Sequence, residues 1–173
     1  MKFEELVMKT VINLRGRDLT DANLVDLTKV LRESTVLKKL HLDYNDITLD
    51  NNGRVFTKAL ASNRTIEVLN LSWNKISSQG ITLLAGALGD NKSLVEVYLS
   101  HNNIDENGCK ALTVAFLKNR GNLGQVFLSD NEGTDAVSEL INEITRLKKD
   151  YSSRMEEMEE LKGKLQKCED DME

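Results

Sequence analysis

Ile66-Glu67-Val68-Leu69-Asn70-Leu71-Ser72-Trp73-Asn74-Lys75-Ile76 is the stretch that decides the fold. It combines apolar residues at Ile66, Leu69, Leu71 and Ile76 with an asparagine at Asn74. The same spacing returns every 28 or 29 residues in copies that begin at Leu37, Leu94 and Leu123, the last of them degraded. One such copy would be weak evidence, but four at so constant a period indicate an internal repeat.

The shared pattern, L-x-x-L-x-L-x-x-N-x-L, is that of leucine-rich repeats. In each copy the L-x-L alternation predicts a short strand with its leucines inward. The asparagine amide is suited to bond backbone groups of adjacent turns, so we expect a ladder of these residues. The second half of each copy has helical apolar spacing, with Gly53, Gly80 and Gly108 near the helix starts allowing close backbone approach.

A strand plus a full helix at this period resembles the ribonuclease-inhibitor class of leucine-rich repeats. The resemblance covers roughly residues 9–145. It implies an α/β solenoid: a short right-handed horseshoe arc with about five parallel strands inside, helices outside and a long C-terminal helix. An atypical first repeat is expected around Ile12 and Leu14, preceded by a short amphipathic cap helix at residues 2–8. We expect residues 1–147 to form this repeat domain.

Residues 148–173 are predicted to continue the last repeat helix as a coiled coil. Their apolar spacing changes to a 3,4 alternation, broken only by Arg154, which is typical of a heptad seam. The charges beside the seam weakly favour a parallel pair, so the helix is expected to form a homodimer or to dock on another coiled coil. The seam residues are Tyr151, Met158, Leu161, Leu165, Cys168 and Met172.

Composition narrows the class of protein. The chain is 40% hydrophobic and 29% charged, which fits a globular protein with a core, and its net charge of −5 argues against nucleic-acid and anionic-membrane partners. No apolar run is long enough to span a bilayer, and the first residues do not resemble a signal peptide. The two distant cysteines and the lack of cysteine caps indicate a cytoplasmic protein, and a subunit of a cytoskeletal assembly is one form that fits this prediction.

The residues between the inward leucines should face the concave side of the solenoid. Large rings stand in this set where the repeat pattern demands no burial, and aromatic residues on an exposed sheet are typical binding anchors. An isolated exposed ring usually has no function, but here several converge. The predicted partner-binding residues are His41, Tyr44, Asn70, Trp73, Tyr98, His101 and Phe127.

No residue set indicates catalysis. Two histidines without a companion cysteine or carboxylate pair do not predict a metal site, and the glycines follow the repeat, so we expect neither metal nor cofactor. The sequence therefore favours a non-enzymatic scaffold or adaptor that binds a protein partner on its concave face. The alternatives are an enzyme inhibitor and a GTPase-activating protein resembling the Ran GTPase activator. The small arc of about five strands argues against the GTPase-activating protein.

Overall fold

Five short parallel strands form one sheet with its strands in chain order, β1-β2-β3-β4-β5. The computed structural model describes residues 3–119, 121–132, 143–144, 146, 150 and 153–164. Each strand covers the middle of one L-x-L motif, so the repeat spacing alone sets the order of the sheet. The strands are β1 Val11–Asn13, β2 Lys39–His41, β3 Val68–Asn70, β4 Glu96–Tyr98 and β5 Gln125–Phe127.

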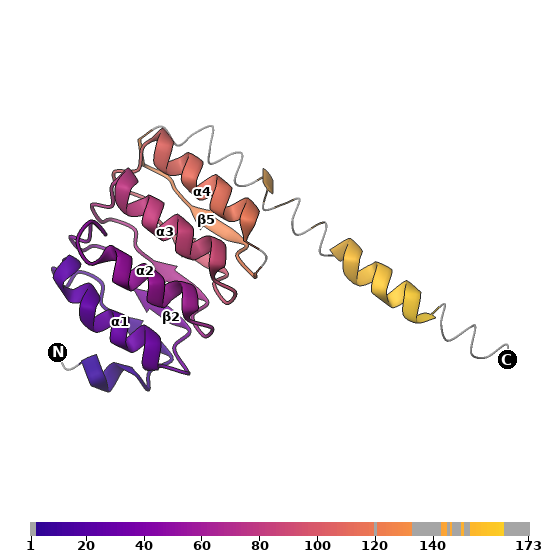
Figure 1. Cartoon of the computed structure of the whole chain (residues 1–173), viewed down its shortest axis with the longest axis horizontal. Coiled ribbons are helices and arrows are strands. Elements are labelled where there is room, and N and C mark those ends of the chain that lie inside the picture. The colour runs from indigo at the N-terminus through magenta and orange to yellow at the C-terminus, as the bar shows by residue number, and fades with distance from the viewer. Residues whose placement is uncertain are drawn as a thin grey trace.

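A layer of helices covers one side of this sheet (Figure 1). Each helix packs against the next along the stack, and together they build the predicted α/β solenoid. The helices are α1 Leu24–Glu33, α2 Gly53–Ser62, α3 Ser78–Asp90 and α4 Glu106–Lys118, with a 3₁₀ helix, η2 Asp21–Asn23, ahead of α1.

Both ends of the chain differ from the repeats between them. The cap helix predicted at residues 2–8 is a shorter 3₁₀ helix, η1 Phe3–Leu6, whose Leu6 is buried in the core. At the other end, Ile144 packs against the same core, and residues 153–164 are helical. A single helix running from the last repeat to the C-terminus would pass through residues outside the described ones, so its continuity stays a prediction.

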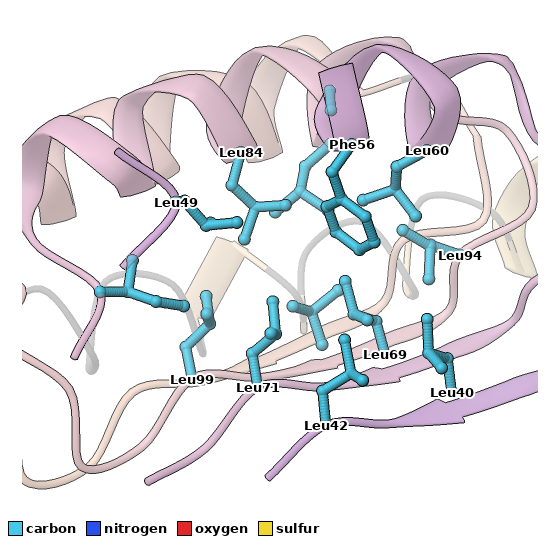
Figure 2. Packing of buried hydrophobic residues seen from close by; sticks show 14 of the residues in the cluster. Leu40, Leu42, Leu49, Phe56, Leu60, Leu69, Leu71, Leu84, Leu94 and Leu99 are labelled. Carbon is cyan, nitrogen blue, oxygen red and sulfur yellow. The ribbon is translucent and has the colours of Figure 1, made fainter. Parts of the chain in front are cut away.

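The core lies between the sheet and the helices (Figure 2). Leu40 and Leu69 from the strands, with Leu99 directly after β4, meet three side chains from the helices (Figure 2), and all six are at most 1% exposed. The helix residues are Phe56, Leu60 and Leu84. One repeat cannot enclose such an apolar face alone, so each repeat is stabilised by the neighbours stacked against it.

The predicted asparagine ladder runs along the stack where each strand ends. Asn74 accepts a hydrogen bond from the Ile47 amide, and its Nδ2 donates to the carbonyls of Leu42 and Leu71, so one side chain joins two repeats. Asn45, Asn102 and Asn131 make the corresponding bonds. These amides satisfy backbone groups that the turn would otherwise bury without partners.

A second asparagine ladder, which the sequence analysis missed, lies at the C-terminal ends of the helices. Asn63 and Asn91 each follow the last residue of a helix and are buried. The Nδ2 of Asn91 donates to the Leu60 carbonyl one repeat back, and its Oδ1 accepts from the amides of Ser93 and Leu94. Asn119 continues the row. Within the described residues, side-chain amides thus join the first four repeats to one another along both edges.

Gly80 shows why glycine recurs near the helix starts. A Cβ at this position would overlap the backbone carbonyl oxygen of Thr48 and lie 3.0 Å from the Leu49 Cβ. Gly86, on the same helix, has nothing within 4 Å of a Cβ. The predicted close approach therefore exists at Gly80, against a backbone atom that cannot easily move.

Gly80→Ala should lower the free energy of unfolding by about 1–3 kcal/mol, because the added methyl forces α3 away from the second repeat. Gly86→Ala is the matched control and should raise it by up to ~1 kcal/mol through helix propensity. Urea denaturation followed by circular dichroism measures both. Equal effects of the two substitutions would contradict the packing described for Gly80.

Asp21 joins the irregular first repeat to the second. Its buried carboxylate accepts hydrogen bonds from the amides of Thr48, Leu49 and Asn51 and from the Thr48 hydroxyl. Burial by itself raises the pKa of Asp21, but the hydrogen bonds from Asn51, Thr48 and Leu49 together outweigh it, so the pKa is lowered. The charged form is therefore the one the fold prefers.

Asp21→Asn should lower the free energy of unfolding by roughly 2–3 kcal/mol at neutral pH, because the amide turns an NH₂ group toward backbone donors. A depressed folded pKa contributes stability above the unfolded value of about 3.9 and loses it as pH falls through the folded value. The difference between wild type and variant should thus be constant near pH 7 and shrink below about pH 4. Asp26→Asn, at an exposed carboxylate, is the control. A gap that stays constant down to pH 2.5 would contradict this account.

Candidate functional site

In each repeat, the third residue beyond the end of the strand has a left-handed backbone. Tyr44, Trp73, His101 and Asp130 have φ of 57°, 56°, 55° and 58°, and Gly16 has 59° at the same place in the first repeat. The repeat imposes this conformation, because the amide of each of the first four such residues bonds a carbonyl of the next repeat, as Trp73 does to Ser100. Glycine and asparagine adopt it readily, whereas a large ring there costs about 1 kcal/mol.

Three consecutive repeats nevertheless place rings at this position. We call the resulting set, Arg15, Tyr44, Trp73, His101 and Asp130, the ring row. The Tyr44 and Trp73 rings stack at 5.0 Å between centroids and 12° between planes, and Trp73 and His101 stack at 3.7 Å and 20°. The Arg15 guanidinium lies 4.2 Å above the Tyr44 ring, and the His101 Nε2 is 3.1 Å from an Asp130 carboxylate oxygen. The row thus crosses all five repeats.

Stacking uses the ring faces and leaves ring edges toward solvent. Tyr44 is 43% exposed and Trp73 is 45% exposed. Neither the Tyr44 hydroxyl nor the Trp73 indole N–H has a hydrogen-bond partner among the described residues. The row therefore offers free donors together with apolar edges, a combination that is typical of protein-binding anchors.

A second row lies on the strands themselves. The register pairs Asn13, His41, Asn70, Tyr98 and Phe127 across the five strands, as the repeat spacing predicted. Tyr98 and Phe127 stack at 4.5 Å and 11°, and Phe127 is 37% exposed. We call Asn13, His41, Asn70, Tyr98 and Phe127 the strand row. Small residues follow it by two positions, just beyond the ends of β3, β4 and β5, and precede the ring row: Ser72, Ser100 and Ser129.

Glu96 orients Tyr98. Its carboxylate oxygen accepts a hydrogen bond from the Tyr98 hydroxyl at 2.8 Å. Burial raises the pKa of Tyr98, and the hydrogen bond to Glu96 and the charge of that residue raise it further. The phenol therefore stays protonated, so the ring is a fixed, neutral part of the surface.

The structure places all seven predicted partner-binding residues in the two rows. It brings Tyr44, Trp73 and His101 into one stack, and it puts Tyr98 and Phe127 in another with His41 and Asn70 along the same row. The prediction missed Arg15 and Asp130, which end the ring row. Counting one repeat beyond His101 reaches Asp130, so the repeat period carried a signal for that residue.

The predicted coiled-coil seam lies partly within the described residues. Met158 and Leu161 belong to the helical stretch 153–164 and are 48% and 63% exposed. Their pairing with another helix stays a prediction. The other seam residues, Tyr151, Leu165, Cys168 and Met172, lie outside the described residues.

The remaining chemistry of the described residues is structural. None of their His, Cys, Asp and Glu side chains gather in a group of three that could hold a metal ion. Cys109 is fully buried, as expected for a small core residue, and burial, reinforced by the Asp105 charge, raises the pKa of its thiol. Within the described chain no helix is long and apolar enough to cross a membrane.

Comparison with known proteins decides the family. A family model described as "Leucine Rich repeat" matches residues 33–50, 62–85 and 90–112, which are segments of three successive repeats of the stack. The chain is a leucine-rich repeat protein. The ribonuclease-inhibitor-like subclass stays a prediction.

Two curated relatives of this leucine-rich repeat protein are large multidomain proteins. It is 31% identical over 137 residues to human NACHT, LRR and PYD domains-containing protein 5. This alignment covers 78% of this chain and 11% of the relative. It is 30% identical over 135 residues to mouse NACHT, LRR and PYD domains-containing protein 14, covering 77% of this chain and 13% of the relative. The match therefore spans about a tenth of each relative's length.

Among solved structures, the leucine-rich repeat protein resembles "Leiomodin-1 Actin-Binding Site 2 (ABS2)". The TM-score is 0.70, the identity is 22%, and the alignment covers 88% of each chain. At this identity the likeness establishes the fold, an α/β leucine-rich repeat solenoid. Membership of the leucine-rich repeat family supports a protein-interaction module.

Proposed function

We propose that this protein is a non-enzymatic interaction module that binds a protein partner on its concave face, across the ring row and the strand row. The observation that carries the proposal is the stack of Tyr44, Trp73 and His101 at left-handed backbone positions. These positions are easier for glycine or asparagine, and Tyr44 and Trp73 remain 43% and 45% exposed there. A feature that fold stability does not require is best explained by use at the surface.

The energetics of the ring row support a role in binding. Each ring stack stabilises the fold by about 0.5–1.5 kcal/mol, which roughly offsets the cost of about 1 kcal/mol for placing a ring in the left-handed region. The row is therefore close to neutral for folding. It holds its rings in fixed positions before any partner arrives, so little side-chain freedom is lost on association.

Trp73→Asn combined with Tyr98→Ala tests the proposal. Asparagine suits the left-handed backbone, so the melting temperature should change by only a few degrees, while partner affinity should fall at least tenfold because two central anchors are lost. The readout is the set of proteins from a lysate of the source organism that bind wild-type resin but not variant resin.

The matched control removes apolar side chains from the helix side of the solenoid. Val114 and Leu117 on α4 are 65% and 58% exposed, so Val114→Ala with Leu117→Ala removes comparable exposed surface away from the two rows. This variant should capture the same proteins as wild type. If the ring variant also captured the same proteins while remaining folded, the concave face would not be the binding surface.

Actin is the named partner to test first. The structural neighbour is named as an actin-binding site, which supports a place for this chain in a cytoskeletal assembly. Co-sedimentation with filamentous actin, and the rate of actin assembly, should both respond to wild type and respond less to the Trp73→Asn, Tyr98→Ala variant. No response at tens of micromolar would exclude actin as the partner. The proposal of an interaction module would remain, with another protein as its partner.

We further propose that the C-terminal helix joins two copies through its apolar seam. Support comes from Met158 and Leu161, which are exposed on a helical stretch and have no role in the repeat core. Two joined copies would present two concave faces and bind a multivalent partner with added avidity.

Light scattering on a size-exclusion column over a concentration series tests the seam. We expect a dimer mass that returns to a monomer mass in Met158→Asp with Leu161→Asp, because two charges would enter the seam. Glu156→Gln with Glu160→Gln is the control, on exposed positions of the same helix away from the seam, and should leave the mass unchanged. A wild-type monomer at every concentration would contradict self-association.

A further inference from the structure

The concave face is electrically polarised along the stack. The segments 93–109 and 121–132, which supply the strand and turn of the fourth and fifth repeats, contain no lysine or arginine. The first two repeats instead place Arg15, Arg17 and Lys39 on exposed strand and turn positions. Carboxylates on this face therefore meet cations at one end of the sheet and not at the other.

The ion pairs of the face follow this division. In the first three repeats, Asp43 pairs with Arg15, Asp46 with Lys75 at 2.6 Å, and Glu67 with Lys38 at 2.6 Å. In the fourth and fifth repeats two carboxylates of the face, Glu96 and Asp130, have no lysine or arginine partner within the described part of the chain. Among the described residues, Glu96 accepts a hydrogen bond from the neutral Tyr98 hydroxyl and Asp130 pairs with His101. No lysine or arginine among these residues compensates the negative charge of Glu96 and Asp130.

The stacked pair Tyr98 and Phe127 lies between these two carboxylates. Glu96 precedes Tyr98 by two residues on β4, and Asp130 follows Phe127 by three residues beyond β5. Lysine and arginine side chains pack their aliphatic stems along rings while the charged head reaches a carboxylate. Rings flanked by carboxylates that have no lysine or arginine partner among the described residues match that chemistry better than they match an acidic or purely apolar segment.

We infer that the partner presents a basic segment to the β4–β5 end of the concave face. This inference rests on the proposed function, since it names the chemistry of the partner for the same surface. Lysine or arginine heads contact Glu96 and Asp130, their stems and neighbouring apolar residues lie on Tyr98 and Phe127, and the chain continues along the ring row. The cationic first two repeats repel such a segment, so the polarity also fixes which end of the face it occupies.

Peptide display gives the first test. A library of random 12-residue peptides is selected on the immobilised full chain and counter-selected on the Trp73→Asn, Tyr98→Ala variant. We expect the peptides that depend on the rings to carry net positive charge. Ring-dependent peptides that are neutral or acidic would overturn this inference and leave the proposed function standing, whereas a failure to recover any ring-dependent peptide would contradict both.

Charge variants then locate the contact on the strongest synthetic peptide. Glu96→Gln with Asp130→Asn should weaken binding about tenfold at low salt and reduce its salt dependence. Asp46→Asn with Glu67→Gln is the matched control: it removes the same charge from carboxylates that are already paired, and affinity should stay within about twofold. Equal effects of the two double variants would show that only net charge matters and would overturn the assignment to the β4–β5 end.

Discussion

Every repeat makes two sharp backbone turns at the edge of the core, and the polar groups of those turns must be satisfied. An unpaired buried amide or carbonyl costs about 1–3 kcal/mol, so a stack of repeats is stable only if each turn has a partner. Asparagine meets this need on both edges, because its side chain both accepts and donates. Asn74 and Asn91 represent the two ladders, and each bonds backbone groups of its own repeat and a neighbouring one.

The ladders separate what the fold requires from what the surface can vary. Asparagine satisfies the backbone groups and leucine buries the apolar area. The side chains on the sheet face opposite the helices can therefore vary without loss of the core. The turns also impose a left-handed backbone at one shared position of the repeats, and the chain places Tyr44, Trp73 and His101 there. The core and the proposed binding surface therefore use different positions of the same short segments.

Much of the solenoid could be predicted because its rules are periodic. The alternation of side chains along a strand placed Tyr98 beside Phe127 once the repeat length was known, and Gly80 indicated a close backbone contact. The second ladder was missed because Asn63 lies outside the repeat motif, at a helix end that the apolar pattern does not define. Arg15 over Tyr44 was missed because a guanidinium above a ring depends on side-chain directions that spacing cannot supply.

Trp73 is the only tryptophan of the chain and stands at the centre of the ring row, so its fluorescence reports directly on that surface. The decisive measurement is quenching of this fluorescence by acrylamide, with and without a saturating ring-dependent peptide from the display selection. If the concave face is the binding surface, the bound peptide covers the exposed edge of the indole and lowers the quenching constant severalfold. An unchanged constant at saturation would place binding elsewhere and contradict the account.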